Sequence, residues 1–99
     1  MQACRESSIV AAIVRKLRNV SGVTVRKRHG TAWGMAGDPD LYGSVRGRHF
    51  EIEVKAPGGQ PTALQERRLA EWKAADALTG IAHCAADALR ILGLDAERP

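Results

Sequence analysis

The stretch GDPDLYGSVRGRHFEIEVK, residues 37–55, decides the fold of this 99-residue chain. Apolar and charged residues alternate over residues 49–54, which is the two-residue period of a strand with one buried face. A second strand is predicted over residues 41–45, and Arg46-Gly47 is short enough to join the two strands as a tight turn. The stretch therefore predicts a β-hairpin.

The register of this hairpin decides where its charged side chains lie. If residues 46–47 form the turn, Val45 pairs with Arg48 and, counting outward, Asp40 faces Glu53. Directly opposed residues share a face of the sheet, with Cβ atoms roughly 5 Å apart. An even number of loop residues keeps this arrangement, whereas an odd number turns Asp40 to the other face. Lys55 follows Glu53 by two positions and leaves the strand on the same side.

A carboxylate pair held face to face is destabilising unless a cation lies between the two acids. Asp40 and Glu53, completed by the backbone carbonyl of Val54 and by water, offer the hard oxygen ligands that Mg²⁺ prefers. Lys55 beside them is suited to orient a water molecule and to offset charge that grows on a phosphate. Taken alone, Glu53 and Lys55 are also consistent with a simple solvated ion pair.

The rest of the chain predicts an α/β domain. Apolar residues at helical spacing indicate a first helix, and Thr62 is placed to cap a second one. The predicted order is αβββαβ followed by a short helical segment, with one domain spanning residues 1–99. The expected elements besides the hairpin are a helix over 7–19, a strand over 23–29, a helix over 62–77, a strand over 81–85 and helical turns over 86–92.

Composition narrows the class of protein. Hydrophobic residues make up 44% of the chain, which is enough for a packed core, and the net charge of +4 with a pI near 9.6 favours a polyanionic partner such as nucleic acid. A short chain buries a small core, so a homodimer is plausible from size alone. Cys4 and Cys84 form neither a disulfide framework nor a zinc motif. With a polar start and no long apolar run, the sequence predicts a cytoplasmic protein without a membrane segment.

Three sequence features together resemble the PD-(D/E)xK nuclease superfamily, and within it the short stand-alone form of the virus-type replication-repair nuclease (VRR-NUC) family. They are Gly37-Asp38-Pro39-Asp40-Leu41, then Glu53-Val54-Lys55, then Gln65 on the next helix. The resemblance implies a restriction-endonuclease-like core, with a mixed sheet flanked by helices. It also implies hydrolysis of DNA with Mg²⁺ or Mn²⁺ to leave a 5′-phosphate, and a homodimer that acts on branched DNA such as Holliday junctions in phage or mobile-element processing.

By the same resemblance, Asp40 and Glu53 are metal ligands, Lys55 is the catalytic lysine, and Gln65 and Glu6 belong to the catalytic site. Glu6 and Gln65 each have a second interpretation. A glutamate in a first helical turn is favoured by the helix dipole alone. Gln65 follows Thr62 by three positions and forms a capping box with it.

Several other residues are candidates for contact with DNA. Trp33 in the glycine-rich loop is suited either to stack on a base or to pack against the protein. Glu51 is expected at the surface, and the histidines are assigned no role. A non-catalytic DNA-binding module of the same fold is the alternative function, and a sequence-specific restriction-type enzyme is disfavoured because little chain remains for base-reading loops. The predicted phosphate contacts are Arg26, Arg28, Arg67 and Arg68.

Overall fold

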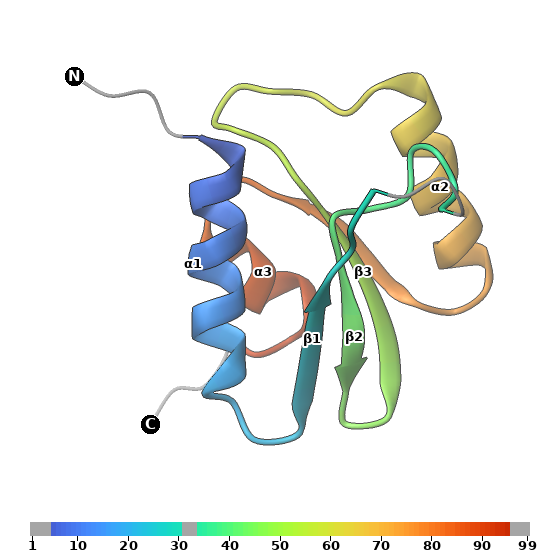
Figure 1. Ribbon diagram of the computed structural model, residues 1–99. Coiled ribbons are helices and arrows are strands. Elements are labelled where there is room, and N and C mark those ends of the chain that lie inside the picture. Colours follow the sequence, from blue (N-terminus) through green and yellow to red (C-terminus); the bar gives the residue numbers. More distant parts are fainter. Residues whose placement is uncertain (1–4, 31–33, 96–99) are drawn as a thin grey trace.

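A four-stranded mixed sheet lies between helices on its two faces (Figure 1), in a computed structural model that describes residues 5–30 and 34–95. The α/β class, the mixed sheet and the order αβββαβ with a closing helix are as the sequence predicts. The elements are α1 (Glu6–Arg18), β1 (Val23–Lys27), β2 (Leu41–Val45), β3 (Arg48–Val54), α2 (Ala63–Ala74), β4 (Leu78–Ala82) and α3 (Ala85–Ile91).

The β2–β3 hairpin has the predicted register. Val45 pairs with Arg48, and the ladder runs outward to Leu41 opposite Ile52. Arg46 and Gly47 form the turn with φ angles of 49° and 88°. Positive φ at both turn positions matches the right-handed twist of the two strands, which is why two-residue hairpin turns adopt this conformation.

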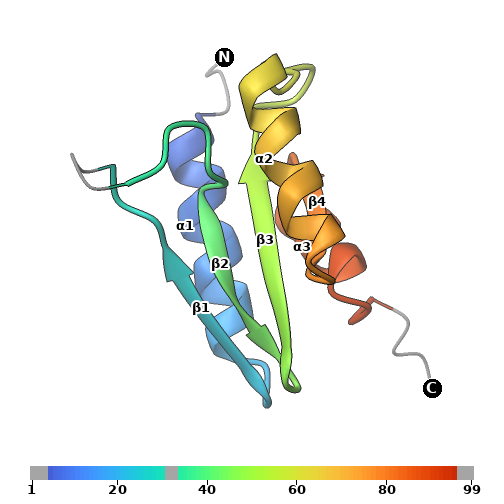
Figure 2. The same ribbon diagram turned by 90° about the vertical axis from the view of Figure 1, so that its right-hand side faces the viewer.

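The order of strands in the sheet is β1-β2-β3-β4, so β1 and β4 are the edges. β1, β2 and β3 are antiparallel neighbours, whereas β4 runs parallel to β3. A parallel neighbour requires a crossover, and α2 provides it. The crossover places α2 on the face of the sheet opposite to α1 and α3 (Figure 2).

The main core lies between the sheet and the pair α1 and α3. Ile13 and Leu17 of α1 are fully buried, as are Phe50, Ile52 and Val54 of β3. These strand residues occupy alternate positions, so they all leave β3 on the face that α1 and α3 cover. The opposite face of β3 carries Glu51, Glu53 and the following Lys55, toward α2.

Four predicted boundaries differ from the structure by two residues or more. β1 ends at Lys27, two residues short of the prediction. α2 ends at Ala74 and β4 spans Leu78–Ala82, so the end of the helix and both ends of the strand lie three residues earlier than expected. The physical reason lies in the link between α2 and β4, where Asp76 adopts a left-handed conformation with φ 74° and reverses the chain before Gly80 is reached.

Cys4 and Trp33 lie outside the described residues, so the interpretations placed on them stay predictions. Within the described ranges, none of the helices combines the length and the apolar character needed to cross a membrane.

Gly43 of β2 allows the central strands to approach closely. A Cβ atom there would overlap the carbonyl oxygen of Thr24 and lie 2.9 Å from Cζ of Phe50. We expect Gly43→Ala to lower the free energy of unfolding by about 3 kcal/mol, because the backbone oxygen cannot move aside without breaking the β1–β2 ladder. Urea denaturation measures the effect.

Gly30→Ala is the matched control, since among the described residues, apart from its chain neighbours, no atom lies within 4 Å of the added methyl group. It applies the same change to the unfolded chain. Equal stability of the two variants would contradict the tight approach of β1 and β2.

Candidate functional site

Asp40, Glu53 and Lys55 meet at one end of the sheet, where β2 begins and β3 ends. Asp40 lies one position beyond the last ladder pair, and its Oδ2 accepts a hydrogen bond from the backbone nitrogen of Val54 at 2.9 Å. The Nζ atom of Lys55 lies 3.8 Å from Oε2 of Glu53. The turn of even length therefore brings together the three side chains that the sequence analysis placed on one face.

Glu53 is buried without a full set of partners. Its residue is 2% exposed, and its Oε1 atom has no hydrogen-bond partner among the described residues. Burial, followed by the negative charge of Asp40, raises the pKa of Glu53 to about 8, although Lys55 acts in the opposite direction. A cation bound here would stabilise the ionised form of Glu53 and provide a partner for its second oxygen.

Glu6 and His83 lie at the margin of this cluster. Oε2 of Glu6 accepts a hydrogen bond from the backbone nitrogen of Ala56 at 3.4 Å, which ties the start of α1 to the segment after β3. Nδ1 of His83 lies 3.2 Å from the carbonyl oxygens of both Lys55 and Ala56. Because carbonyl oxygens only accept, Nδ1 carries the proton. His83 thus fixes the backbone of Lys55, a role that the sequence analysis did not assign.

The donor set fits a hard divalent cation. Among the described residues, no group of three or more His, Cys, Asp and Glu side chains is arranged as a metal site. Asp40 and Glu53 are two adjacent carboxylates, however, and Mg²⁺ is commonly held by one or two carboxylates and completed by water and substrate phosphate. The orphaned Oε1 of Glu53 is the observation that favours such an ion here. The predicted use of the Val54 carbonyl stays a prediction.

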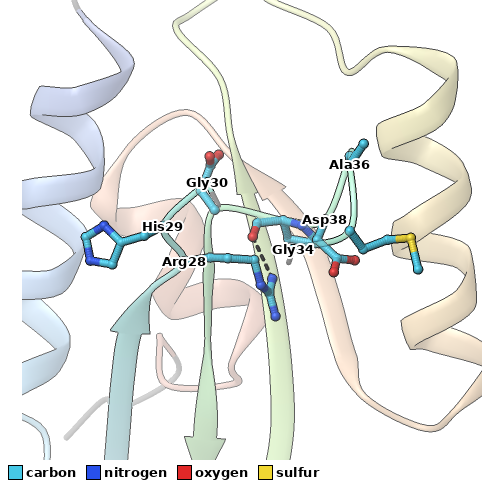
Figure 3. Close-up of a pocket in the computed structure, with 10 residues that line it drawn as sticks. Arg28, His29, Gly30, Gly34, Ala36 and Asp38 are labelled. Carbon is cyan, nitrogen blue, oxygen red and sulfur yellow. Dashed lines mark hydrogen bonds between the residues drawn. The ribbon is translucent and has the colours of Figure 1, made fainter. Parts of the chain in front are cut away.

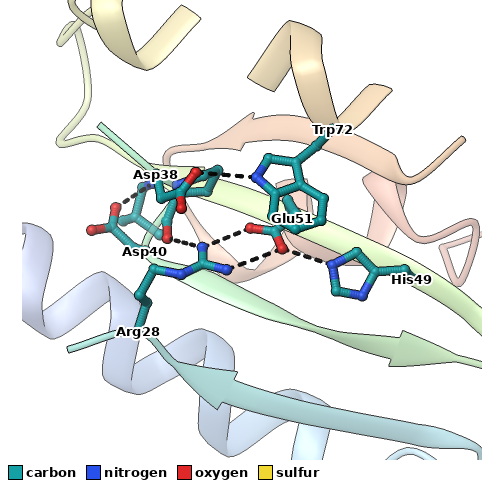
Figure 4. Close-up of polar contacts among 8 residues, drawn as sticks. Arg28, Asp38, Asp40, His49, Glu51 and Trp72 are labelled. Carbon is teal, nitrogen blue, oxygen red and sulfur yellow. Dashed lines mark hydrogen bonds and ion pairs between the residues drawn. The ribbon is translucent and has the colours of Figure 1, made fainter. Parts of the chain in front are cut away.

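Glu51 is buried, which corrects the expectation that it lies at the surface. Its side chain is 0% exposed. Arg28 donates to its two carboxylate oxygens at 2.7 and 3.1 Å, and Nε2 of His49 lies 2.7 Å from Oε2 (Figure 4). The expectation was wrong because α2 covers this face of β3, so an acid there requires partners. His49, given no role from sequence, is one of them.

Arg28 also holds the backbone beside Asp40. Its guanidinium donates to the carbonyl oxygen of Pro39 at 2.6 Å, and its backbone nitrogen donates to the carbonyl of Asp40 at 2.7 Å. The hydrogen bonds to Glu51 raise the pKa of the Arg28 guanidinium, so it remains charged. The indole of Trp72 donates to Asp38 at 3.2 Å and secures the same segment from α2 (Figure 4).

The predicted DNA contacts differ in how free their side chains are. Arg28 is engaged in the buried ion pair, and Arg68 is 15% exposed and donates to the carbonyl of Ala36 and to Glu71. Arg67 is 75% exposed, and Arg26 is also exposed. Contact of these four residues with DNA stays a prediction.

Gln65 forms the predicted capping box with Thr62. Its Oε1 accepts from the backbone nitrogen of Thr62 at 2.9 Å, and its own backbone nitrogen donates to the Thr62 hydroxyl at 3.1 Å. This cap gives Gln65 a structural role, and its part in catalysis stays a prediction.

A pocket of about 320 Å³ opens beside Asp40. Arg28, His29 and the glycine-rich segment from Gly34 to Asp38 line it, with Asp38 facing across toward Arg28 (Figure 3). It adjoins the carboxylate cluster through Pro39 and Asp40, so it belongs to the same end of the sheet.

Two solved structures have this arrangement of elements. One is a VRR_NUC domain protein with a TM-score of 0.78 and 13% identity, matched over 97% of this chain and 91% of that one. The other is described as a VRR_NUC domain, with a TM-score of 0.72 and 21% identity over 89% and 94% of the two chains. The chain has the fold of VRR_NUC domains.

This likeness confirms the predicted resemblance at the level of fold. No protein-family model matches the sequence, and no curated protein matches it. The VRR_NUC fold is therefore recognisable here from structure and from the few residues around Asp40 and Glu53, rather than from the sequence as a whole.

Glu53 makes the stability of the metal-free protein depend on pH. Its pKa is higher in the folded chain, about 8 against an ordinary 4.5, so the folded state binds the extra proton between these values. The free energy of unfolding therefore falls as pH rises through this window. We expect Glu53→Gln to remove the penalty and to gain on the order of 2 kcal/mol over the wild type at the alkaline end.

Thermal denaturation in chelator from acid to alkaline pH measures this difference. Glu66→Gln, at an exposed position on α2, is the control and should show no such trend. A Glu53→Gln difference that stays constant across the window would contradict the shifted pKa.

The Arg28–Glu51 pair gives a second prediction for stability. We expect Arg28→Met to cost about 3 kcal/mol, because it leaves the carboxylate of Glu51 buried without its main partner. Arg48→Met breaks an exposed pair with Asp76, whose side chains are 52% and 94% exposed, and should cost less than about 1 kcal/mol.

Urea denaturation compares the two variants. The double variant Arg28→Met with Glu51→Leu should recover much of the loss, because no unpaired charge remains buried. An equal loss in the free energy of unfolding for Arg28→Met and Arg48→Met would show that the buried pair stabilises the fold no more than the exposed pair.

Proposed function

We propose that this protein is a metal-dependent nuclease that hydrolyses phosphodiester bonds in DNA. The observation that carries the proposal is the buried Glu53, with one oxygen unpartnered, between Asp40 and Lys55 in a VRR_NUC fold. The basic net charge of +4 supports a polyanionic substrate.

Asp40 and Glu53 would hold Mg²⁺ or Mn²⁺ through their carboxylate oxygens. When bound, the ion supplies Lewis-acid polarisation of the scissile phosphate and makes water a stronger nucleophile. Asp40 is kept in place by the backbone nitrogen of Val54 and by Arg28, so the carboxylate is oriented before substrate arrives. Such orientation lowers the cost of reorganisation during the reaction.

The ammonium group of Lys55 has two tasks in this mechanism. It hydrogen-bonds and orients the water that attacks phosphorus, and it offsets the negative charge that grows on the phosphoryl oxygens. The water oxygen forms the new bond to phosphorus as the bond to the 3′ oxygen breaks, which leaves a 5′-phosphate and a 3′-hydroxyl. His83 holds the Lys55 carbonyl and fixes the strand from which the ammonium projects.

The resemblance to the VRR-NUC family extends the proposal to branched DNA and to a homodimer. Resolution of a four-way junction requires cuts in two strands, whereas the described part of one chain provides one Asp40–Glu53–Lys55 site. Purified protein with Mg²⁺ or Mn²⁺ should therefore be tested against single-stranded, duplex, flap and four-way-junction DNA, with its oligomeric state measured in parallel.

Substitution of the site provides the decisive test of catalysis. We expect Asp40→Asn to abolish cutting and Lys55→Met to slow it by a factor of about 10² or more, because each removes a group needed only in the reaction. DNA affinity without metal should change little. Lys16→Met, an exposed lysine on α1, is the control for loss of one positive charge.

Cutting by Asp40→Asn at the wild-type rate would overturn the site. If the wild type binds DNA but cuts none of the substrates with either metal, the DNA-binding module is the correct function instead.

A further inference from the structure

Positive charge is concentrated in one segment of the chain. Residues 7–37 contain six Lys and Arg and no Asp or Glu, although the whole chain has 15 basic and 11 acidic residues. The remaining residues thus hold nine basic and eleven acidic side chains, by subtraction of the same counts. The chain is basic because of α1, β1 and the segment after β1.

The basic side chains of this segment also form fewer salt bridges with acidic side chains than those in the rest of the described chain. Within the part of the chain that the structure describes, Arg48, Arg67, Arg68 and Arg90 each form a salt bridge with an acid. None of the salt bridges found there involves the exposed basic side chains of α1 and β1, which are Arg15, Lys16, Arg18, Arg26 and Lys27.

A groove of about 530 Å³ gathers three of these bases. Its α1 residues recur at helical spacing on one side of the helix, and Lys27 closes it from the end of β1. Val10 and Val14 are the least exposed residues that line it, whereas Arg15 and Arg18 are exposed. β1 is an edge strand, so the groove runs beside the open side of the sheet.

One end of the groove lies beside Glu6, at the margin of the candidate catalytic site. Ser7 lines it, and the neighbouring Glu6 accepts from Ala56 next to Lys55. Figure 1 shows α1 starting at the end of the sheet where β3 finishes. From Ser7 to Arg18 the helix rises roughly 17 Å, which matches about five nucleotides of one DNA strand.

We propose that this groove, defined by Ser7, Val10, Val14, Arg15, Arg18 and Lys27, binds the phosphate backbone of DNA and leads it to the Asp40–Glu53–Lys55 site. The inference rests on the proposed function for its choice of DNA. A row of basic side chains without acidic partners matches the regularly spaced phosphates of a DNA strand. A second copy of the chain is a poorer partner, because a symmetric contact would place the same positive charges opposite one another.

The test compares two triple variants that lose the same charge. The first variant combines Arg15→Gln, Arg18→Gln and Lys27→Gln, which removes the positive charge of the groove. The second combines Arg46→Gln, Lys73→Gln and Arg90→Gln, which removes three exposed bases elsewhere. Affinity for a fluorescent duplex is measured by anisotropy in chelator from low to physiological salt. We expect the groove variant to lose affinity about tenfold or more and to reduce the salt slope by about three, with a much smaller change in the other.

Equal losses in the two triple variants, or a larger loss in the second, would overturn the groove. So would binding to vesicles of anionic phosphatidylglycerol with none to the duplex. Both variants are checked for wild-type thermal stability, which surface substitutions should preserve.

Nicking of supercoiled plasmid with Mg²⁺ separates this inference from the proposed function. The groove variant should show a raised KM and a kcat close to that of the wild type. If the wild type binds through the groove but never cuts, the nuclease proposal fails and the groove stands. If the wild type cuts DNA and the groove variant binds DNA as the wild type does, the groove proposal fails and the nuclease proposal stands.

Discussion

The two-residue turn at Arg46-Gly47 is the constraint on which the site depends. Both residues have positive φ, so β2 and β3 are joined without an extra residue on either strand. A shift of one residue would move every side chain of β2 to the other face and separate Asp40 from Glu53. The turn lies at the far end of the hairpin from these acids, yet it fixes their proximity through an uninterrupted ladder.

Glu51 and Glu53 leave the same strand on the same face, and both are buried. Their surroundings nevertheless differ. Arg28 and His49 satisfy both oxygens of Glu51, whereas Glu53 has Lys55 at 3.8 Å and one oxygen that finds no partner in the described part of the chain. A buried carboxylate whose oxygens are all paired holds the surrounding residues in place. A buried carboxylate that lacks such partners has a raised pKa and is a candidate to bind a ligand. This contrast separates Glu51, which has a structural role, from Glu53, the acid of the proposed catalytic site.

Glu51 also supports the backbone around Asp40, the other acid of the proposed site. Glu51 orients Arg28, and Arg28 holds the carbonyls of Pro39 and Asp40. From the other side Trp72 of α2 bonds to Asp38. Asp40 is thus fixed through its backbone by residues that lie far from it in the sequence, which is the support that its proposed role as a metal ligand would require.

Local patterns in the chain were enough to predict the alternation over residues 49–54, the turn at 46–47, and therefore the register that brings Asp40, Glu53 and Lys55 together. The other features of the site arise from contacts between elements that are distant in the chain. The burial of Glu51 depends on α2 crossing that face, its partner Arg28 lies 23 residues away, and His83 reaches Lys55 from beyond β4. The end of α2 was likewise misplaced, because the left-handed Asp76 reverses the chain earlier than the glycine signal. Period and turn length act between neighbours in the chain, whereas burial and pairing depend on which elements meet in space.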